Sequence, residues 1–116
     1  MSTIGDPQVK GAVLNSTLTT NLLEATAGTR IRIDHIFISN GATGGNLTLS
    51  VYDSSPTPTT YEIFNAYPVA ANNATSGNIP PIELTALYLE AGDQIRGGIT
   101  TSTDAKITFH YFVITL

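Results

Sequence analysis

Two histidines, His35 and His110, are the side chains of this 116-residue chain best suited to act as a general base near neutral pH. Nucleophilic catalysis needs a Ser, Thr or Cys beside such a base. The chain has no Cys, but with 8 Ser and 18 Thr a hydroxyl close to a histidine carries little information. A G-x-S-x-G elbow is absent from the sequence. We therefore expect no catalytic residue, and we expect His110 to pack or form a hydrogen bond on the face of a sheet.

The sequence does not indicate a metal site or a cofactor either. Zinc sites cluster Cys and His, whereas the two histidines here are 75 positions apart. Calcium would have to use Asp53, Asp93 or Asp104, whose spacing does not match an EF-hand. Asp93 follows Gly92 in an expected tight turn, where a carboxylate accepts backbone N–H groups. We expect a structural role for it, and no bound metal or cofactor.

Three tyrosines leave sugar binding open as an alternative. No pair of carboxylates is singled out for glycoside hydrolysis, and the chain has no Trp to stack on a sugar ring. Tyr52, Tyr61 and Tyr67 precede an Asn-rich loop and are aromatic platforms of the same kind. Tyrosines are also ordinary residues of strands and interfaces.

The composition excludes several classes of function. Five Lys and Arg stand against nine Asp and Glu, so the basic footprint that nucleic-acid binding needs is missing. Only 12% of the residues are charged, while Thr, Ser and Asn supply a largely neutral polar surface. Low charge density reduces repulsion between copies, which favours a protein that assembles. Residues 1–10 lack the apolar run of a signal peptide, and residues 107–116 are too short to span a bilayer, so we expect no membrane association.

Short runs rich in Ile, Val, Thr, Tyr and Phe recur between Gly, Pro and Asn clusters, without a helical period. They predict one all-β domain of eight antiparallel strands, near residues 9–14, 17–24, 30–40, 46–53, 60–66, 81–89, 94–101 and 105–115. Prolines at both ends of residues 68–80, and within residues 54–59, place these two segments outside the sheets or on an edge. Gly97 and Gly98 fall inside an expected strand, where they predict a bend or the close approach of another backbone.

The strand near residues 30–40 contains an irregularity. Four isoleucines, at positions 31, 33, 36 and 38, would fall on two different faces of a regular strand. A β-bulge near Asp34 and His35 explains the slip. We expect the His35 ring to satisfy backbone groups that the bulge leaves unpaired.

The order of these elements resembles the small jelly-roll virion proteins of tailed bacteriophages, a loose group that includes head decoration or cement proteins and tail and fibre modules. The resemblance rests on residues 27–40, 47–51, 65–72, 87–96 and 107–116, including the run Leu87-Tyr88-Leu89-Glu90-Ala91-Gly92-Asp93. A Leu-rich strand followed by Ala-Gly-Asp also occurs in cupin-like and tumour-necrosis-factor-like jelly rolls, but the cupin metal histidines are missing here.

The resemblance implies an eight-stranded jelly-roll sandwich over residues 11–116, preceded by an extended N-terminal arm over residues 1–10. It also implies a homo-oligomer, most often a trimer, that binds the major capsid protein in a virion assembled in the host cytoplasm. The alternative is a tail or fibre module that contributes to attachment or recognises host glycan. The partner contacts that we expect are Pro7, Lys10, Tyr52, Tyr61, Tyr67 and Phe112.

Overall fold

The computed structural model describes residues 3–41, 43–71, 79–102 and 104–116, and within these ranges every regular element is a β-strand. The strands are β1 (Thr3–Val13), β2 (Asn21–Glu24), β3 (Thr29–Ser39), β4 (Gly45–Asp53), β5 (Thr59–Val69), β6 (Ile79–Leu89), β7 (Gln94–Thr100) and β8 (Lys106–Thr115). Each lies within a few residues of an expected strand, except that β1 begins earlier. In the described part of the chain, no helix is long and apolar enough to cross a membrane.

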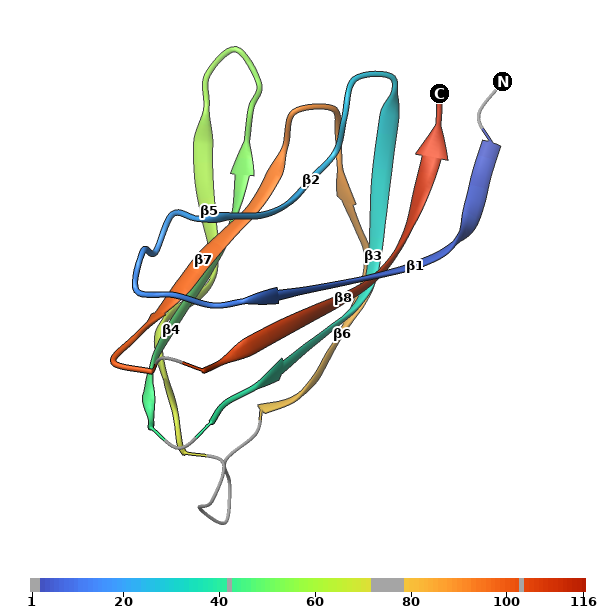
Figure 1. The fold of residues 1–116 in the computed structure, drawn as a ribbon. Helices are drawn as coiled ribbons and strands as arrows, with labels where there is room; N and C mark the ends of the chain where they lie inside the picture. The colour runs from blue at the N-terminus through green and yellow to red at the C-terminus, as the bar shows by residue number, and fades with distance from the viewer. Residues whose placement is uncertain (1–2, 42, 72–78, 103) are drawn as a thin grey trace.

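The strands form two antiparallel sheets that face each other (Figure 1). One has the order β1-β8-β3-β6 and the other the order β2-β7-β4-β5. Hydrogen-bonded pairs join the first strand to the last, the second to the seventh, the third to the sixth and the fourth to the fifth. The prediction of an all-β antiparallel sandwich is therefore confirmed at this level.

Aliphatic side chains from both sheets fill the space between them. Phe109 is fully buried at the centre, and branched residues surround it, because alternating positions on each strand point inward. The largest buried side chains besides Phe109 are Leu14, Ile33, Ile36, Leu47, Leu49, Leu89, Ile95, Ile99 and Ile107.

The predicted bulge in β3 is present. The pairing register of β3 shifts between Ile33 and His35 against both of its neighbours, β6 and β8. The extra residue, Asp34, reverses the alternation, so the isoleucines on both sides of it point into the core. All four isoleucines of β3 are consequently buried.

Residues 3–10, which were expected to be part of an extended N-terminal arm, form an edge strand of the domain. Thr3 pairs with Thr115 and Lys10 with Phe109, so residues 3–10 lie along β8 rather than reaching away from the domain. The backbone groups of β8 on that side would otherwise be unpaired, which explains why these exposed residues are extended in the sheet.

Proline and glycine take the positions that their chemistry allows. Residues 54–58 connect β4 to β5, as expected. Pro68 and Pro80 lie inside β5 and β6, the edge strands of the two sheets, where a missing N–H donor is tolerated. The middle of the expected 68–80 loop lies outside the described residues. A Cβ on Gly98 would stand 2.5 Å from the carbonyl oxygens of Asn15 and Thr17, so the expected close approach of a second backbone is confirmed.

Two buried polar side chains fix the loops at opposite ends of the sandwich. Asn40 donates to the carbonyls of Thr43 (2.8 Å) and Ala70 (3.1 Å), while its Oδ1 accepts from the Gly41 N–H (2.9 Å) and the Ser102 hydroxyl (2.5 Å). It therefore links three segments that are far apart in sequence.

Asp93 links the loops at the other end of the sandwich. Its carboxylate accepts hydrogen bonds from the backbone N–H of Ser54 (2.9 Å), the Ser54 hydroxyl (3.1 Å) and the backbone N–H of Glu90 (3.0 Å). The expected structural role of Asp93 as an acceptor of backbone N–H groups is confirmed.

Candidate functional site

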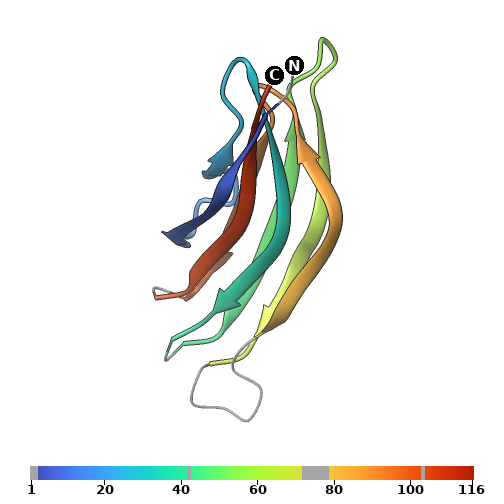
Figure 2. The same ribbon diagram turned by 90° about the vertical axis from the view of Figure 1, so that its right-hand side faces the viewer.

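The most distinctive surface is the side of the β1-β8-β3-β6 sheet that faces away from the core, which we call the outer face. Figure 2 looks onto this sheet, with β1, β8, β3 and β6 side by side. Because side chains alternate along each strand, residues next to a buried position point to the outer face. These residues are Ile4, Pro7, Val9 and Val13 of β1, Arg30, Arg32, His35 and Phe37 of β3, Tyr88 of β6, and Thr108, His110 and Phe112 of β8.

Apolar side chains line the β1 edge of the outer face. Val9 is 65% exposed, Ile4 59% and Val13 58%. They share one face because each stands opposite an outward-pointing residue of β8. Three large aliphatic side chains left in water on one strand form an apolar strip of the kind that marks a protein interface.

Aromatic rings and arginines occupy the middle of the outer face. The guanidinium of Arg32 lies 4.5 Å from the centre of the Phe112 ring, and its Nε donates to Asp34 at 3.1 Å. Arg30 lies 5.7 Å from the centre of the Tyr88 ring and forms an ion pair of 2.8 Å with Glu90. Each of these two cations is balanced by a carboxylate of the same chain. Lys106, opposite Val13, adds one exposed cation, so the described side chains of the outer face carry little net charge.

The two histidines lie opposite each other on this face. His35 and His110 are paired positions of β3 and β8, with ring centres 6.4 Å apart. Phe37 completes the group, its ring centre 4.9 Å from that of His110 and 6.1 Å from that of His35. Separation along the chain concealed this proximity, because adjacent strands of this sheet are distant in sequence. The expectation that His110 packs on a sheet face is confirmed.

The six expected partner contacts do not share one surface. Pro7 and Phe112 are directly opposed on the outer face. Lys10 stands opposite the core residue Phe109, so it points to the other side of the edge strand β1. The three tyrosines belong to the second sheet, and the structure does not bring Tyr52 together with the other two.

Tyr52 is covered by its own chain, because the Arg96 guanidinium lies 3.7 Å from the centre of its ring. Tyr61 is opposite Val51 and Tyr67 is opposite Leu47, residues that pack in or against the core, so both point toward the inner side of β5. They remain 58% and 45% exposed because β5 is an edge strand. The Phe64 ring lies 5.0 Å from that of Tyr67.

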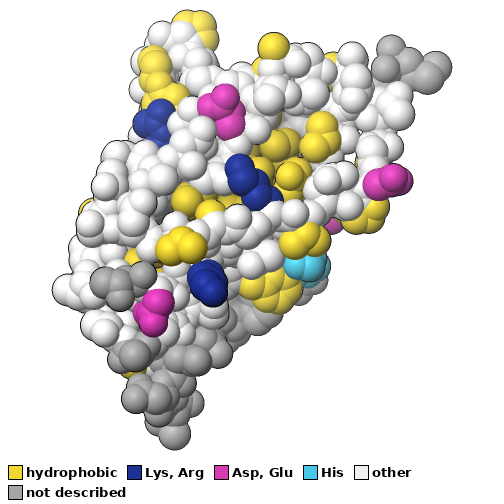
Figure 3. Space-filling view, in the orientation of Figure 1, with side chains coloured by type: hydrophobic (Ala, Val, Ile, Leu, Met, Phe, Trp, Pro, Cys, Tyr) yellow, Lys and Arg dark blue, Asp and Glu magenta, His cyan; other side chains and the backbone are white. Residues whose placement is uncertain are grey.

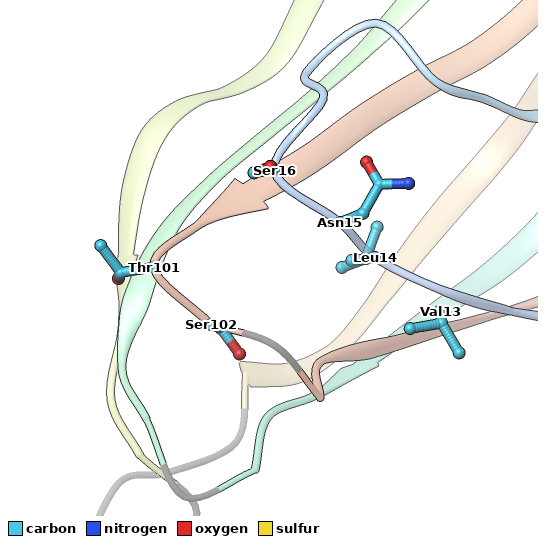
Figure 4. A pocket seen from close by; sticks show the side chains of 6 residues that line it. All are labelled: Val13, Leu14, Asn15, Ser16, Thr101 and Ser102. Atoms are coloured by element: carbon cyan, nitrogen blue, oxygen red, sulfur yellow. The ribbon is translucent and has the colours of Figure 1, made fainter.

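A shallow pocket of about 340 Å³ lies where β1 leaves its sheet, beside the turn between β7 and β8 (Figure 4). Three of its polar side chains are already engaged within the chain: Asn15 accepts from the Thr17 N–H, Thr101 donates to the Gly44 carbonyl, and Ser102 donates to Asn40. No charged side chain lines the pocket. It therefore offers little chemistry to a ligand.

Charged side chains are few, as the composition predicts. On the face drawn in Figure 3 they are scattered over a surface that is mostly neutral. Among the described residues, no three His, Asp or Glu side chains gather into a metal-binding cluster.

No family model, curated protein or solved structure matches the chain.

Proposed function

We propose that this chain is a structural protein of a virus particle: a capsid decoration or cement protein that self-associates, binds the major capsid protein and stabilises the head. It acts by assembly rather than by catalysis. The observation that carries the proposal is the outer face, where the apolar strip of Ile4, Val9 and Val13 stands beside Phe112 with little net charge. Such a surface is stabilised when another protein covers it.

The proposal includes a finer assignment of the fold as an eight-stranded jelly roll. Its support is the nested pairing, in which the first and last strands pair outermost and β4 and β5 innermost. A single long hairpin of paired strands that is rolled into two sheets produces this nesting and the two observed strand orders. Jelly rolls are common in capsid proteins, which agrees with the resemblance noted from the sequence.

The edge strand β1 is the second support. Its residues 3–10 are exposed along their whole length. Soluble monomers usually protect a long edge with charges, prolines or bulges. Asp6, Pro7 and the register shift beside it protect the first half of β1, but residues 8–13 carry only Lys10. An edge of this kind suits a protein whose edge meets a neighbouring subunit, and we propose a homotrimer seated on the capsid.

The direct test is the protein content of purified particles from the virus whose genome carries this sequence. Mass spectrometry of those particles is expected to find the chain, and immunogold labelling is expected to mark heads. Labelled tails with unlabelled heads would favour an attachment role, and absence of the chain from particles would contradict a virion function.

A tail or fibre module that recognises host glycan is the second candidate. The observation that favours it is the exposed pair Tyr61 and Tyr67 on the edge strand β5, with Phe64 packed against Tyr67. Exposed aromatic rings are the platforms on which sugars stack. Glycan-array binding that disappears in Tyr67→Ala but persists in Val9→Lys would favour this role, whereas no binding by the wild-type chain would exclude it.

A further inference from the structure

We propose that His35 and His110 form a binding site for a divalent transition-metal ion, with Zn²⁺ as the reference ion. The inference does not depend on the virion function. Its basis is the direct opposition of the two imidazoles on adjacent strands, 6.4 Å between ring centres. Imidazole nitrogen is a preferred ligand of Zn²⁺, Cu²⁺ and Ni²⁺ and a poor one for Mg²⁺ or Ca²⁺.

The distance between the rings fits ligation after a small rotation. With Zn–N bonds of about 2.0–2.1 Å, two imidazoles on one tetrahedral ion have ring centres about 5 Å apart. The observed separation is 6.4 Å, so ligation requires the rings to approach by slightly more than about 1 Å, which we propose occurs by side-chain rotation. His110 is exposed and therefore has room to rotate. Each ring ligates through one nitrogen and keeps the other for a hydrogen bond, as metal-bound histidines usually do.

The surroundings define what kind of site this is. Phe37 forms an apolar wall beside the two rings, with its centre 4.9 Å from that of His110. The nearby cation Arg32 is held by Asp34 and by the ring of Phe112, which partly offsets its charge. The described residues supply no third ligand in a cluster. A tetrahedral ion held by these two imidazoles has two further positions, which water or another side chain can fill.

Ion binding would also join the two central strands of the sheet. β3 and β8 pair along ten positions, and the histidines lie near the middle of that pairing. A ligand that binds the folded chain and not the unfolded one raises the melting temperature. Metal binding is therefore visible in thermal unfolding, whether or not the chain assembles.

The experiment uses the untagged chain with Zn²⁺, and with Mg²⁺ as the hard-cation control. Isothermal titration calorimetry is expected to give one Zn²⁺ per chain, and scanning calorimetry a rise of several degrees in melting temperature with Zn²⁺ but not Mg²⁺. His35→Gln and His110→Gln should each weaken Zn²⁺ binding by more than about tenfold, since losing even the partners of a ligand costs that much. Thr108→Gln changes a residue two positions from His110 on the same face and should leave the Zn²⁺ affinity unchanged.

Co²⁺ gives a second readout that does not depend on the variants. Addition of the wild-type chain to Co²⁺ is expected to change the visible absorption spectrum of the ion, and EDTA should reverse the change. Zn²⁺ binding that is equal in wild type and in His110→Gln, or absent from both, would overturn the proposal. Either result would leave the virion assignment untouched, because that is tested by the content of the particle.

Discussion

Pro7 of β1 lies directly opposite Phe112 of β8, although 105 positions separate them in the sequence. This pair joins the two ends of the chain on one surface, and the strip of Ile4, Val9 and Val13 extends along it. Pro7 also coincides with a shift of register between Ile4 and Pro7, where the ladder lacks a donor. The two terminal strands thus build the β1 edge of the outer face, and changes to this edge are expected to affect assembly before they affect folding.

Val9→Lys tests the apolar strip. The side chain is 65% exposed, so the isolated subunit loses little by the substitution, but an interface would have to bury a charged ammonium. We expect self-association to weaken by about 10- to 100-fold, roughly 1.4–2.8 kcal/mol, with a melting temperature close to that of wild type. Sedimentation velocity over a concentration series measures the association.

Thr60→Lys is the matched control, because it adds the same charge at an exposed position of β5, in the other sheet. Its association constant should equal that of the wild-type chain. Equal weakening by both substitutions would indicate a general charge effect and would remove the special role of the outer face.

Deletion of Asp34 tests the bulge. Without this residue, Ile33 and Ile36 keep their inward positions and pair regularly with β8, because Asp34 is the residue that this pairing skips. The expected cost is the half-buried contact between Arg32 and Asp34, about 1 kcal/mol. Deletion of Thr108 from β8 instead turns the core residues on one side of it outward and should prevent folding. Circular dichroism with thermal unfolding distinguishes the two, and equal damage by both deletions would contradict the bulge.

Asn40→Ala should destabilise the domain more than the replacement of an exposed polar side chain does. The side chain is 3% exposed and makes four hydrogen bonds that join residues 40–43, Ala70 and Ser102. Their loss leaves buried groups unpaired, so we expect the free energy of unfolding to fall by about 2–3 kcal/mol. Urea denaturation gives the value. Asn46→Ala, at an exposed position of β4, should change it by less than about 0.5 kcal/mol, and similar losses in the two variants would exclude a linking role for Asn40.

Gly98→Ala tests the close approach of the β1–β2 connection to β7. The added methyl group would meet two backbone oxygens at 2.5 Å, and neither can move without shifting the chain. We expect a loss of about 1–3 kcal/mol from overpacking. Gly11→Ala is the control, because its nearest atoms would be 3.9 Å away. Unfolding midpoints that agree between the two variants would show that the connection is not held against Gly98.

Local pattern in the sequence predicted most of the fold. Alternation at Leu47 and Leu49, the slip in β3 and the turn at Gly92 each have a physical cause that acts within a few residues. The place of residues 3–10 in the sheet was not predicted, because their pairing with β8 depends on a partner about 100 positions away. An extended conformation was expected for this segment, but its neighbour proved to be the otherwise unpaired edge of β8.

The candidate site was only partly predictable for the same reason. Pro7 and Phe112 were chosen separately as partner contacts, and their direct opposition on one face follows only from the strand order. The opposition of His35 and His110 had no signal in the spacing, because their strands are adjacent only in the folded sheet. Tyr52 was grouped with Tyr61 and Tyr67 by proximity in sequence, whereas residue parity and the Arg96 contact separate them.

An electron cryo-microscopy map of the native particle at side-chain resolution tests most directly whether another protein covers the outer face. We expect the chain to be present on the head, with density of another protein chain packed against Ile4, Val9 and Phe112 on the outer face. A map in which the outer face is open to solvent, while the opposite sheet makes the contacts with the particle, would contradict it.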